Sequence, residues 1–268
     1  MGTWGMGGTF EEDPTNAKES VELLRFGFEL GVRLVDVAEL HGGGLTEKLV
    51  GEAIQGFPRE TITIITKVSR DHLRHDDVLR AAEGSLRRLG TDYIDLYLVH
   101  KLPPTVTEPE AETFKALERL RTEGIARHIG VSNFDKAQIE KAESYLSGSG
   151  IEANEVEYNL LYQDAAKETI PFCKKKGIGV IAHRPLAKGM LVNGGHPLLK
   201  ELAHLYGKTP AQVTLNWIVS QDMTAIPKAG SKAHLEENIG ALGWNLSKED
   251  VERLKILDHS VPYERIKQ

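Results

Sequence analysis

The sequence predicts an α/β fold, a single (β/α)8 TIM barrel that spans residues 1–268. The first observation is the length of 268 residues, because a barrel of this kind typically takes about 250 residues. The second is a regular alternation of short β-rich runs with amphipathic helical segments, which is typical of parallel strands joined by helices. The third is that no Pro/Ser-rich linker or low-complexity stretch divides the chain. We therefore expect one domain.

Seven β-rich runs follow the first helical segment, and each is short enough and apolar enough to be a buried strand. They lie at residues 32–38, 61–67, 93–100, 128–131, 155–158, 178–182 and 224–226. A barrel needs eight strands. The eighth would have to come from the segment around residues 1–4.

The helical segments are recognised by apolar periodicity and by residues that begin or end helices. We expect them at 16–30, 47–54, 78–89, 110–123, after Asp135, near Asp164, at 197–220 with a break between Gly207 and Pro210, near Lys232 and after Ser247. Asp76 and Asp77 stand where N-caps belong, and Gly90 stands where a C-cap belongs. These capping residues support the helix predicted at 78–89 independently of its apolar periodicity.

A doubly wound open sheet is the structural alternative, since it also alternates strands and helices. That fold would need a Gly-rich phosphate turn directly after its first strand. The segment 2–8, with the sequence GTWGMGG, is rich in glycine but does not match G-x-G-x-x-G, and no helix opens there. The barrel is therefore the favoured interpretation.

Composition narrows the classes of partner. The formal net charge is −6 with acidic and basic residues interspersed, and no basic stripe indicates nucleic acid. No apolar run approaches the roughly 18 residues of a membrane span, and no signal peptide is visible. Cys173 is the only cysteine, so no internal disulfide forms, which fits a reducing compartment. We expect a cytoplasmic protein, a monomer or weak oligomer, that acts on a small molecule.

Polar residues close most of the β-rich runs. The strand-end residues are Asp36, Lys67, His100, Ser132, Asn133, His183, Arg184 and Lys228. In a barrel, the carboxyl ends of the strands carry the chemistry. Asp36, Lys67 and His100 end three consecutive strands and would face one another, which predicts a shared site. The alternative is that each strand simply stops at a polar residue.

Four segments resemble the aldo-keto reductases, in the family's order and spacing. They are 36–47 (DVAELHGGGLTE), 86–100 (LRRLGTDYIDLYLVH), 130–134 (GVSNF) and 226–238 (IPKAGSKAHLEEN). The resemblance covers nearly the whole chain and implies reversible hydride transfer between NAD(P)H and a carbonyl. It also implies a catalytic tetrad of aspartate, tyrosine, lysine and histidine. Asp36, Lys67 and His100 match three of its members, and His41 stands at the tyrosine position.

His41 leaves several interpretations open. In one interpretation, His41 donates the proton or positions a water that does, which gives a reductase of weakened activity. In another, the substrate is so electrophilic that it needs little help from an acid. Alternatively, the chain is a catalytically impaired nucleotide-binding barrel with a regulatory or sensing role, or one altered at position 41. Imidazole can act as an acid, but a cationic Lys67 nearby would disfavour its charged form. The simplest interpretation is that His41 is a loop histidine that only fills space.

The resemblance also implies a cofactor site. Its residues would be Thr3, Trp4, Asp36, Ser132, Asn133, Glu155, His183, Arg184, Leu186, Lys228, Ser231, His234, Glu237 and Asn238. Lys228 matches the residue that meets the 2′-phosphate of NADP, whereas His234 replaces the usual arginine. NADP is therefore favoured, with NAD as the alternative. Trp4 would line the substrate pocket, and Lys101 adds a positive charge where many members carry tryptophan. We expect no metal, because His72 and His75 lack a carboxylate or cysteine partner.

Overall fold

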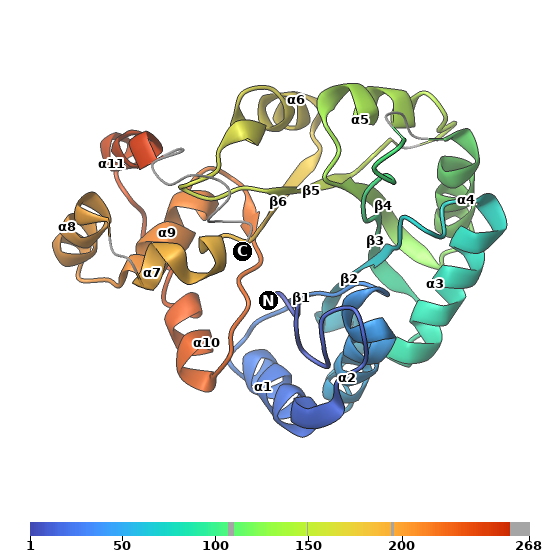
Figure 1. Cartoon of the computed structure of the whole chain (residues 1–268), viewed down its shortest axis with the longest axis horizontal. Helices are drawn as coiled ribbons and strands as arrows, with labels where there is room; N and C mark the ends of the chain where they lie inside the picture. The colour runs from blue at the N-terminus through green and yellow to red at the C-terminus, as the bar shows by residue number, and fades with distance from the viewer. Residues whose placement is uncertain (107–109, 149, 194–195, 258–268) are drawn as a thin grey trace. The chain divides into compact units, whose positions relative to one another are not determined.

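The computed structural model describes residues 1–106, 110–148, 150–193 and 196–257. The chain divides into two compact units, Met1–Asn154 and Glu155–Gln268, and each is described by itself. The strands follow one another in the sheet in the order of the sequence, β1 to β7. Figure 1 shows the course of the chain and the labels of its elements.

The first unit is built on four parallel strands. They are β1 (Leu34–Asp36), β2 (Thr63–Val68), β3 (Ile94–Val99) and β4 (Ala126–Ser132). Asp36 lies opposite Ile65, and Val99 lies opposite both Val68 and Val131. The strands are buried over most of their length, as expected for parallel strands covered on both faces. Their carboxyl ends therefore meet at one edge of the sheet.

The segment predicted as an eighth strand makes a single parallel bridge instead. Gly2 bridges Asp36, and the Thr3 hydroxyl donates to the Asp36 carbonyl over 2.7 Å. The chain turns away directly afterwards, because Gly5 and Gly7 have φ values of +82° and +72°, a region that strands do not use. The prediction of a full strand here was wrong in extent, although the pairing partner is β1.

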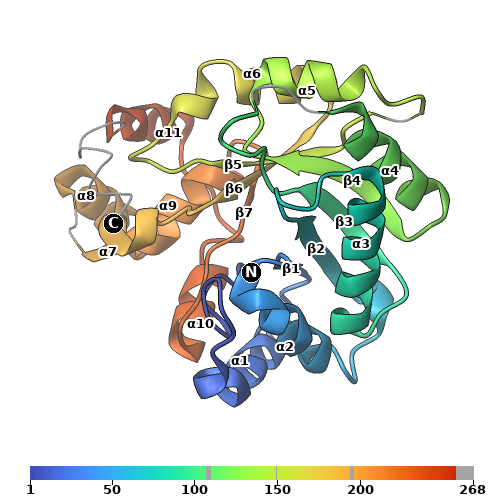
Figure 2. The same ribbon diagram turned by 45° about the vertical axis from the view of Figure 1, so that its right-hand side comes forward.

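Helices of the first unit lie beside its strands in both Figure 1 and Figure 2. They are α1 (Ala17–Glu29), α2 (Leu45–Ala53), α3 (His75–Leu89), α4 (Ala111–Thr122) and α5 (Lys136–Glu143). Asp135 caps α5 in a capping box with Gln138, and Gly90 ends α3 with a φ of +64°, both as predicted. The N-cap of α3 is Arg74 and not Asp76 or Asp77, which lie in the first turn. There they complement the positive end of the helix dipole.

The second unit contains most of β5 (Ala153–Glu157), β6 (Gly179–His183) and β7 (Thr224–Ala225). Its helices are α6 (Thr169–Lys176), α7 (Met190–Asn193), α8 (Pro197–Tyr206), α9 (Pro210–Val219), α10 (Lys232–Ile239) and α11 (Lys248–Leu254). Gly207 ends α8 with a φ of +61°, and Thr209 caps α9, so the predicted break is confirmed. Trp217 stacks on Tyr158 at 5.1 Å between ring centroids and anchors the core of this unit.

Cys173 is buried within α6, as predicted for a packing residue. Within the described part of the chain, no helix has the length and apolar character needed to cross a membrane.

Candidate active site

A buried ion pair joins the ends of β1 and β2. Lys67 Nζ lies 2.5 Å from Asp36 Oδ2 and donates to the Val37 carbonyl over 3.1 Å. The lysine side chain is 1% exposed and that of the aspartate is 6% exposed. Charges are rarely buried this deeply unless they are paired. The pair therefore fixes a compensated ammonium at the edge where the strands end.

Two histidines lie next to this pair. His41 begins the 3-10 turn η2 (His41–Gly44) and is buried, and His100 directly follows β3. Their ring centroids are 5.9 Å apart. The turn depends on glycine, because a Cβ at Gly42 would lie 2.3 Å from the Gly7 carbonyl oxygen. The close approach of these two backbones helps to hold His41 in place.

Both imidazoles are neutral at physiological pH. Burial, followed by the charges of Lys67 and His100, lowers the pKa of His41 well below 6.5. Burial and the charges of Lys67, Lys101 and Arg70 lower the pKa of His100 to about 3. Among the described residues, neither Nδ1 atom has a hydrogen-bond partner although both are buried. A neutral imidazole has one donor and one acceptor nitrogen, so both rings retain hydrogen-bonding capacity for a ligand.

The N-terminal loop adds aromatic side chains beside His41. Trp4 meets the His41 ring edge-on at 4.9 Å between centroids, and Phe10 meets Trp4 in the same manner at 5.2 Å. Trp4 is 41% exposed and Phe10 is exposed. Thr3 is buried and bonded to the backbone of Asp36. This loop therefore forms an aromatic rim at the site.

Glu39 also belongs to this site, although it was not among the residues predicted from the sequence. Its Oε1 accepts the Ser69 backbone N–H over 2.5 Å and lies 3.0 Å from His72 Nδ1. Its own N–H donates to the Lys67 carbonyl over 3.4 Å. Glu39 thus ties the loop that carries His41 to the chain that leaves β2. The sequence feature that could have identified Glu39 is a carboxylate two residues before His41 in a strand-end loop.

Ser132 and Asn133 close β4 on the same unit. Ser132 is buried and Asn133 is exposed with a φ of +62°, a conformation that Asn tolerates better than most residues. Asn133 Nδ2 donates to Ser132 Oγ over 2.9 Å and to the His100 carbonyl over 3.2 Å. The structure therefore places a hydroxyl and an amide next to His100, where an amide-bearing ligand would find partners.

In the second unit, four predicted residues lie within β5 or at and just after the end of β6. Glu155 is buried in β5, His183 ends β6, and Leu186 is half-buried after it. Arg184 has a φ of +52° and pairs with Glu157 over 3.0 Å. Its side chain is 44% exposed. An exposed arginine of this kind is able to bind a phosphate.

The remaining predicted residues gather at α10. Ser231 caps the helix by accepting the His234 N–H over 3.2 Å, and Lys228 is exposed just before it. Glu237 and Asn238 are half-buried in the last turn. Backbone N–H groups at a helix N-terminus favour anions, and the lysine adds a positive charge. This donor set fits a phosphate-bearing nucleotide.

Metal ligation finds no support among residues 1–106, 110–148, 150–193 and 196–257, where no three His, Cys, Asp or Glu side chains are grouped to hold an ion. His72 faces Glu39, whereas His75 lies 2.8 Å from Asp76. The two histidines therefore have separate partners.

Comparison with known proteins gives consistent matches over nearly the whole chain. Residues 1–259 match the model of the aldo/keto reductase family. The chain is 38% identical to methylglyoxal reductase YeaE of Escherichia coli (strain K12) over 266 residues, which cover 98% of this chain and 90% of that protein. Among solved structures, it resembles a thermostable aldo-keto reductase, Tm1743, in complex with the inhibitor epalrestat, with a TM-score of 0.91, 40% identity and coverage of 96% and 93%.

A second structure, an aldo-keto reductase from Klebsiella pneumoniae in complex with NADPH, matches with a TM-score of 0.87 and 34% identity over 96% of this chain and 89% of that one. These likenesses confirm the predicted fold class, an α/β chain of the (β/α)8 type.

Proposed function

We propose, from the premise that this chain belongs to the aldo/keto reductase family, that it reduces small aldehydes and ketones to alcohols with NADPH. Reactive 2-oxoaldehydes such as methylglyoxal are its proposed substrates. The observation that carries the proposal is the buried Asp36–Lys67 pair beside two neutral histidines. A relative at 38% identity is named methylglyoxal reductase, and a solved relative holds NADPH.

The cofactor has suitable donors on this chain. Ser132 and Asn133 would bind the carboxamide of the nicotinamide, because they present a hydroxyl and an amide. Lys228 and the N-terminus of α10 would bind phosphate. Glu155 would accept from the carboxamide nitrogen. When bound, NADPH supplies the hydride for the carbonyl carbon. Because Lys228 and the N–H groups at the N-terminus of α10 would bind the 2′-phosphate that NADP carries and NAD lacks, NADP is the favoured cofactor.

His41 takes the place of the family's tyrosine in this proposal. A neutral imidazole cannot give up a proton as readily as imidazolium, so His41 acts as a hydrogen-bond donor toward the carbonyl oxygen. Donors that are fixed in place stabilise the negative charge that develops on that oxygen. His100 offers a second neutral ring, and the Lys67 ammonium adds positive charge nearby. Water completes the protonation of the alkoxide.

This arrangement suits activated carbonyls. In a 2-oxoaldehyde, the neighbouring carbonyl withdraws electrons, so the alkoxide forms with less help from an acid. A ketone without activation depends more on proton transfer, for which a general acid typically contributes about 10²–10⁴-fold. We therefore expect appreciable turnover of methylglyoxal and weakened turnover of unactivated ketones.

The test compares the unmodified chain with His41→Tyr. NADPH binding is followed by fluorescence, and turnover of methylglyoxal and of acetone is followed by NADPH absorbance. We expect both proteins to bind NADPH, the unmodified chain to reduce methylglyoxal, and His41→Tyr to gain most on acetone. Turnover by His41→Tyr alone would mean that the natural role is not carbonyl reduction and would favour nucleotide sensing. Absence of NADPH binding in both would refute the proposal.

A further inference from the structure

Two cations next to His100 have no part in the proposed reduction. Lys101 directly follows His100 and is exposed, with no ion pair among the described residues. Arg70 follows β2, and its Nε lies 3.9 Å from the carboxylate of the neighbouring Asp71. The Asp71 side chain is 71% exposed, so the attraction between the two is weak and screened. Both cations therefore retain charge for a ligand.

The backbone brings these two residues to the same edge as the catalytic candidates. The His100 N–H donates to the Val68 carbonyl over 3.0 Å, which joins the ends of β2 and β3. Lys101 is one residue beyond that bond and Arg70 is two residues beyond it. At about 3.3 Å per residue, both Cα atoms lie within about 7 Å of the bond along the chain.

The effect of both cations reaches the His100 ring. Burial is the largest cause of its lowered pKa, and the charged groups that lower it further are Lys67, Lys101 and Arg70. Lys67 is compensated by Asp36. Arg70 is 3.9 Å from the exposed Asp71 carboxylate, and Lys101 has no ion pair among the described residues. Both therefore add positive potential where the substrate carbonyl would be bound.

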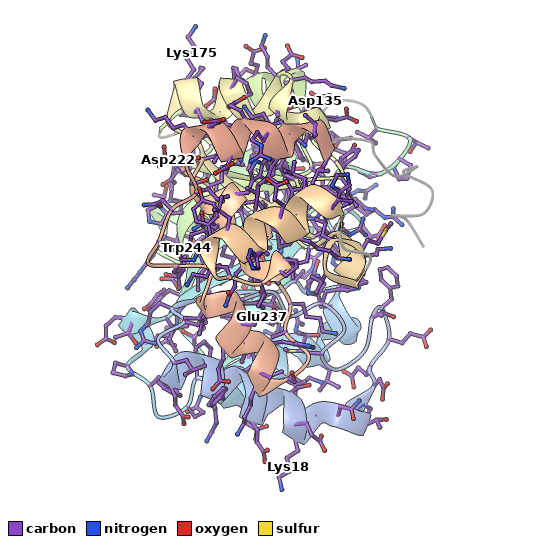
Figure 3. The ribbon with its side chains drawn as sticks, turned by 90° about the vertical axis from the view of Figure 1, so that its left-hand side faces the viewer. Lys18, Asp135, Lys175, Asp222, Glu237 and Trp244 are labelled. Carbon is purple, nitrogen blue, oxygen red and sulfur yellow. The ribbon has the colours of Figure 1, made fainter. Side chains whose placement is uncertain are left out.

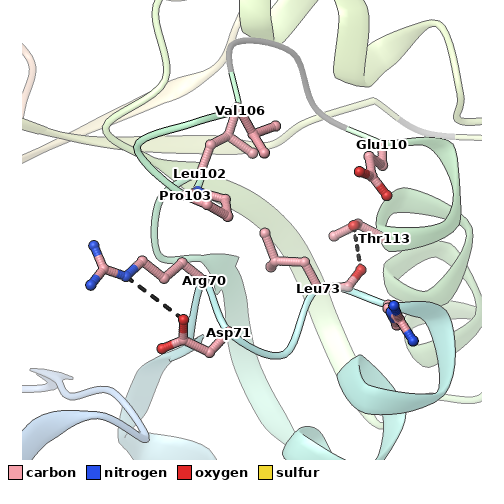
Figure 4. A pocket seen from close by; sticks show the side chains of 9 residues that line it. Arg70, Asp71, Leu73, Leu102, Pro103, Val106, Glu110 and Thr113 are labelled. Atoms are coloured by element: carbon pink, nitrogen blue, oxygen red, sulfur yellow. Dashed lines mark hydrogen bonds and ion pairs between the residues drawn. The ribbon is translucent and has the colours of Figure 1, made fainter.

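Arg70 lines a cavity of about 210 Å³ together with the charged residues Asp71, Arg74 and Glu110, a volume well above the ~10–15 Å³ that a single water needs. Lys101 directly precedes Leu102, which belongs to the same lining. Figure 4 shows its side chains. Leu73, Leu102 and Pro103 give it apolar walls. In this view the Arg70 guanidinium points away from Glu110 and lies beside Asp71, with which it forms the long ion pair.

We propose that Arg70 and Lys101 bind an oxyanion group, carboxylate or phosphate, carried by the carbonyl substrate. This inference rests on the proposed function and narrows its substrate class to short aldehydes and ketones that bear an acidic group. Guanidinium binds planar oxyanions in a bidentate manner, whereas ammonium acts as a point charge. The apolar walls formed by Leu102 and Pro103 would contact the carbon atoms between the carbonyl and the acid.

The test uses matched substrates that differ in charge. 4-Oxobutanoate is compared with methyl 4-oxobutanoate, and glyceraldehyde 3-phosphate with glyceraldehyde, as ratios of kcat/KM. The variants are Arg70→Gln and Lys101→Gln. Lys18→Gln is the matched control, because Lys18 points into solvent from α1 (Figure 3). We expect the unmodified chain to prefer the acid about tenfold, and each variant to lower that ratio about three- to tenfold. Lys18→Gln leaves it unchanged.

The two pairs of substrates distinguish carboxylate from phosphate as the bound group. Added salt lowers the preference, since exposed charges are screened. Equal kcat/KM for acid and neutral analogue in the unmodified chain would overturn the inference while leaving the proposed function intact. So would an acid preference that survives both variants.

Loss of all turnover would overturn the proposed function, and binding then decides the inference separately. Calorimetry compares succinate with dimethyl succinate as ligands of the NADPH-treated protein. Tighter binding of succinate, weakened in Arg70→Gln and Lys101→Gln but not in Lys18→Gln, supports the subsite. Succinate binding that is undetectable, or equal in all three variants, overturns it.

Discussion

The Asp36–Lys67 pair allows a quantitative prediction, because both charges are almost completely buried. Replacing Lys67 by Met removes the ammonium from the Asp36 carboxylate, and replacing Asp36 by Asn removes the carboxylate from the Lys67 ammonium. At 2.5 Å and an effective dielectric constant of about 20, the attraction is about 7 kcal/mol. Desolvation offsets several kcal/mol for each ion. We therefore expect each single substitution to destabilise the fold by about 3–5 kcal/mol.

The double variant Asp36→Asn/Lys67→Met removes both charges together, so no ion stays buried alone. We expect its loss of stability to be smaller than the sum of the single losses by at least about 2 kcal/mol. Urea unfolding, followed by circular dichroism and by tryptophan fluorescence, gives the three free energies of unfolding. Losses that add within about 0.5 kcal/mol, as for independent sites, would refute the reasoning.

Three further predictions concern neighbouring residues. His100 binds a proton only near pH 3 when folded but near pH 6.5 when unfolded, so its contribution to stability is lost as the pH falls between these values. Lowering the pH from 7 to 5 costs about 2 kcal/mol, and His100→Gln removes that part of the pH dependence in urea titrations. Glu39→Ala breaks the hydrogen bond to the Ser69 N–H, and we expect it to lower kcat about tenfold. Glu39→Gln keeps an acceptor oxygen and largely retains kcat. Equal kcat values for the two variants would contradict a positioning role. Gly42→Ala forces a Cβ toward the Gly7 carbonyl oxygen, so we expect a loss of about 2–3 kcal/mol, and a melting temperature unchanged from the unmodified chain would contradict this.

Much of the fold was predictable because local signals and burial agree. The helix that begins after Asp135, the C-cap at Gly90 and the break that begins at Gly207 were predicted from residue type, and the structure confirms all three. The start of α3 was misplaced, since aspartate is favoured both as an N-cap and in the first turn. The segment around Gly2 was predicted as a strand, but glycines with positive φ end its pairing after one bridge.

The placement of polar residues at neighbouring strand ends was predictable from the sequence, but their electrostatics were not. Asp36, Lys67 and His100 stood out as polar ends of consecutive strands. The protonation state of His41 depends on burial and on the distance to other charges, which the sequence does not contain. The role of Glu39 was missed for a similar reason, because its partner Ser69 is distant in the sequence.

The central claim is that His41 assists reduction as a neutral hydrogen-bond donor, and its most direct test is the pH dependence of kcat/KM for methylglyoxal. The unmodified chain and His41→Phe are compared from about pH 5.5 to about pH 8.5, on either side of the ordinary histidine pKa of about 6.5. The account predicts no acid-side rise in the unmodified chain and a rate about 10²-fold lower in His41→Phe, the loss expected for one oxyanion donor. A rate that rises toward acid with an apparent pKa near 6.5, and loses this rise in His41→Phe, would show that imidazolium is the acid and would contradict the account.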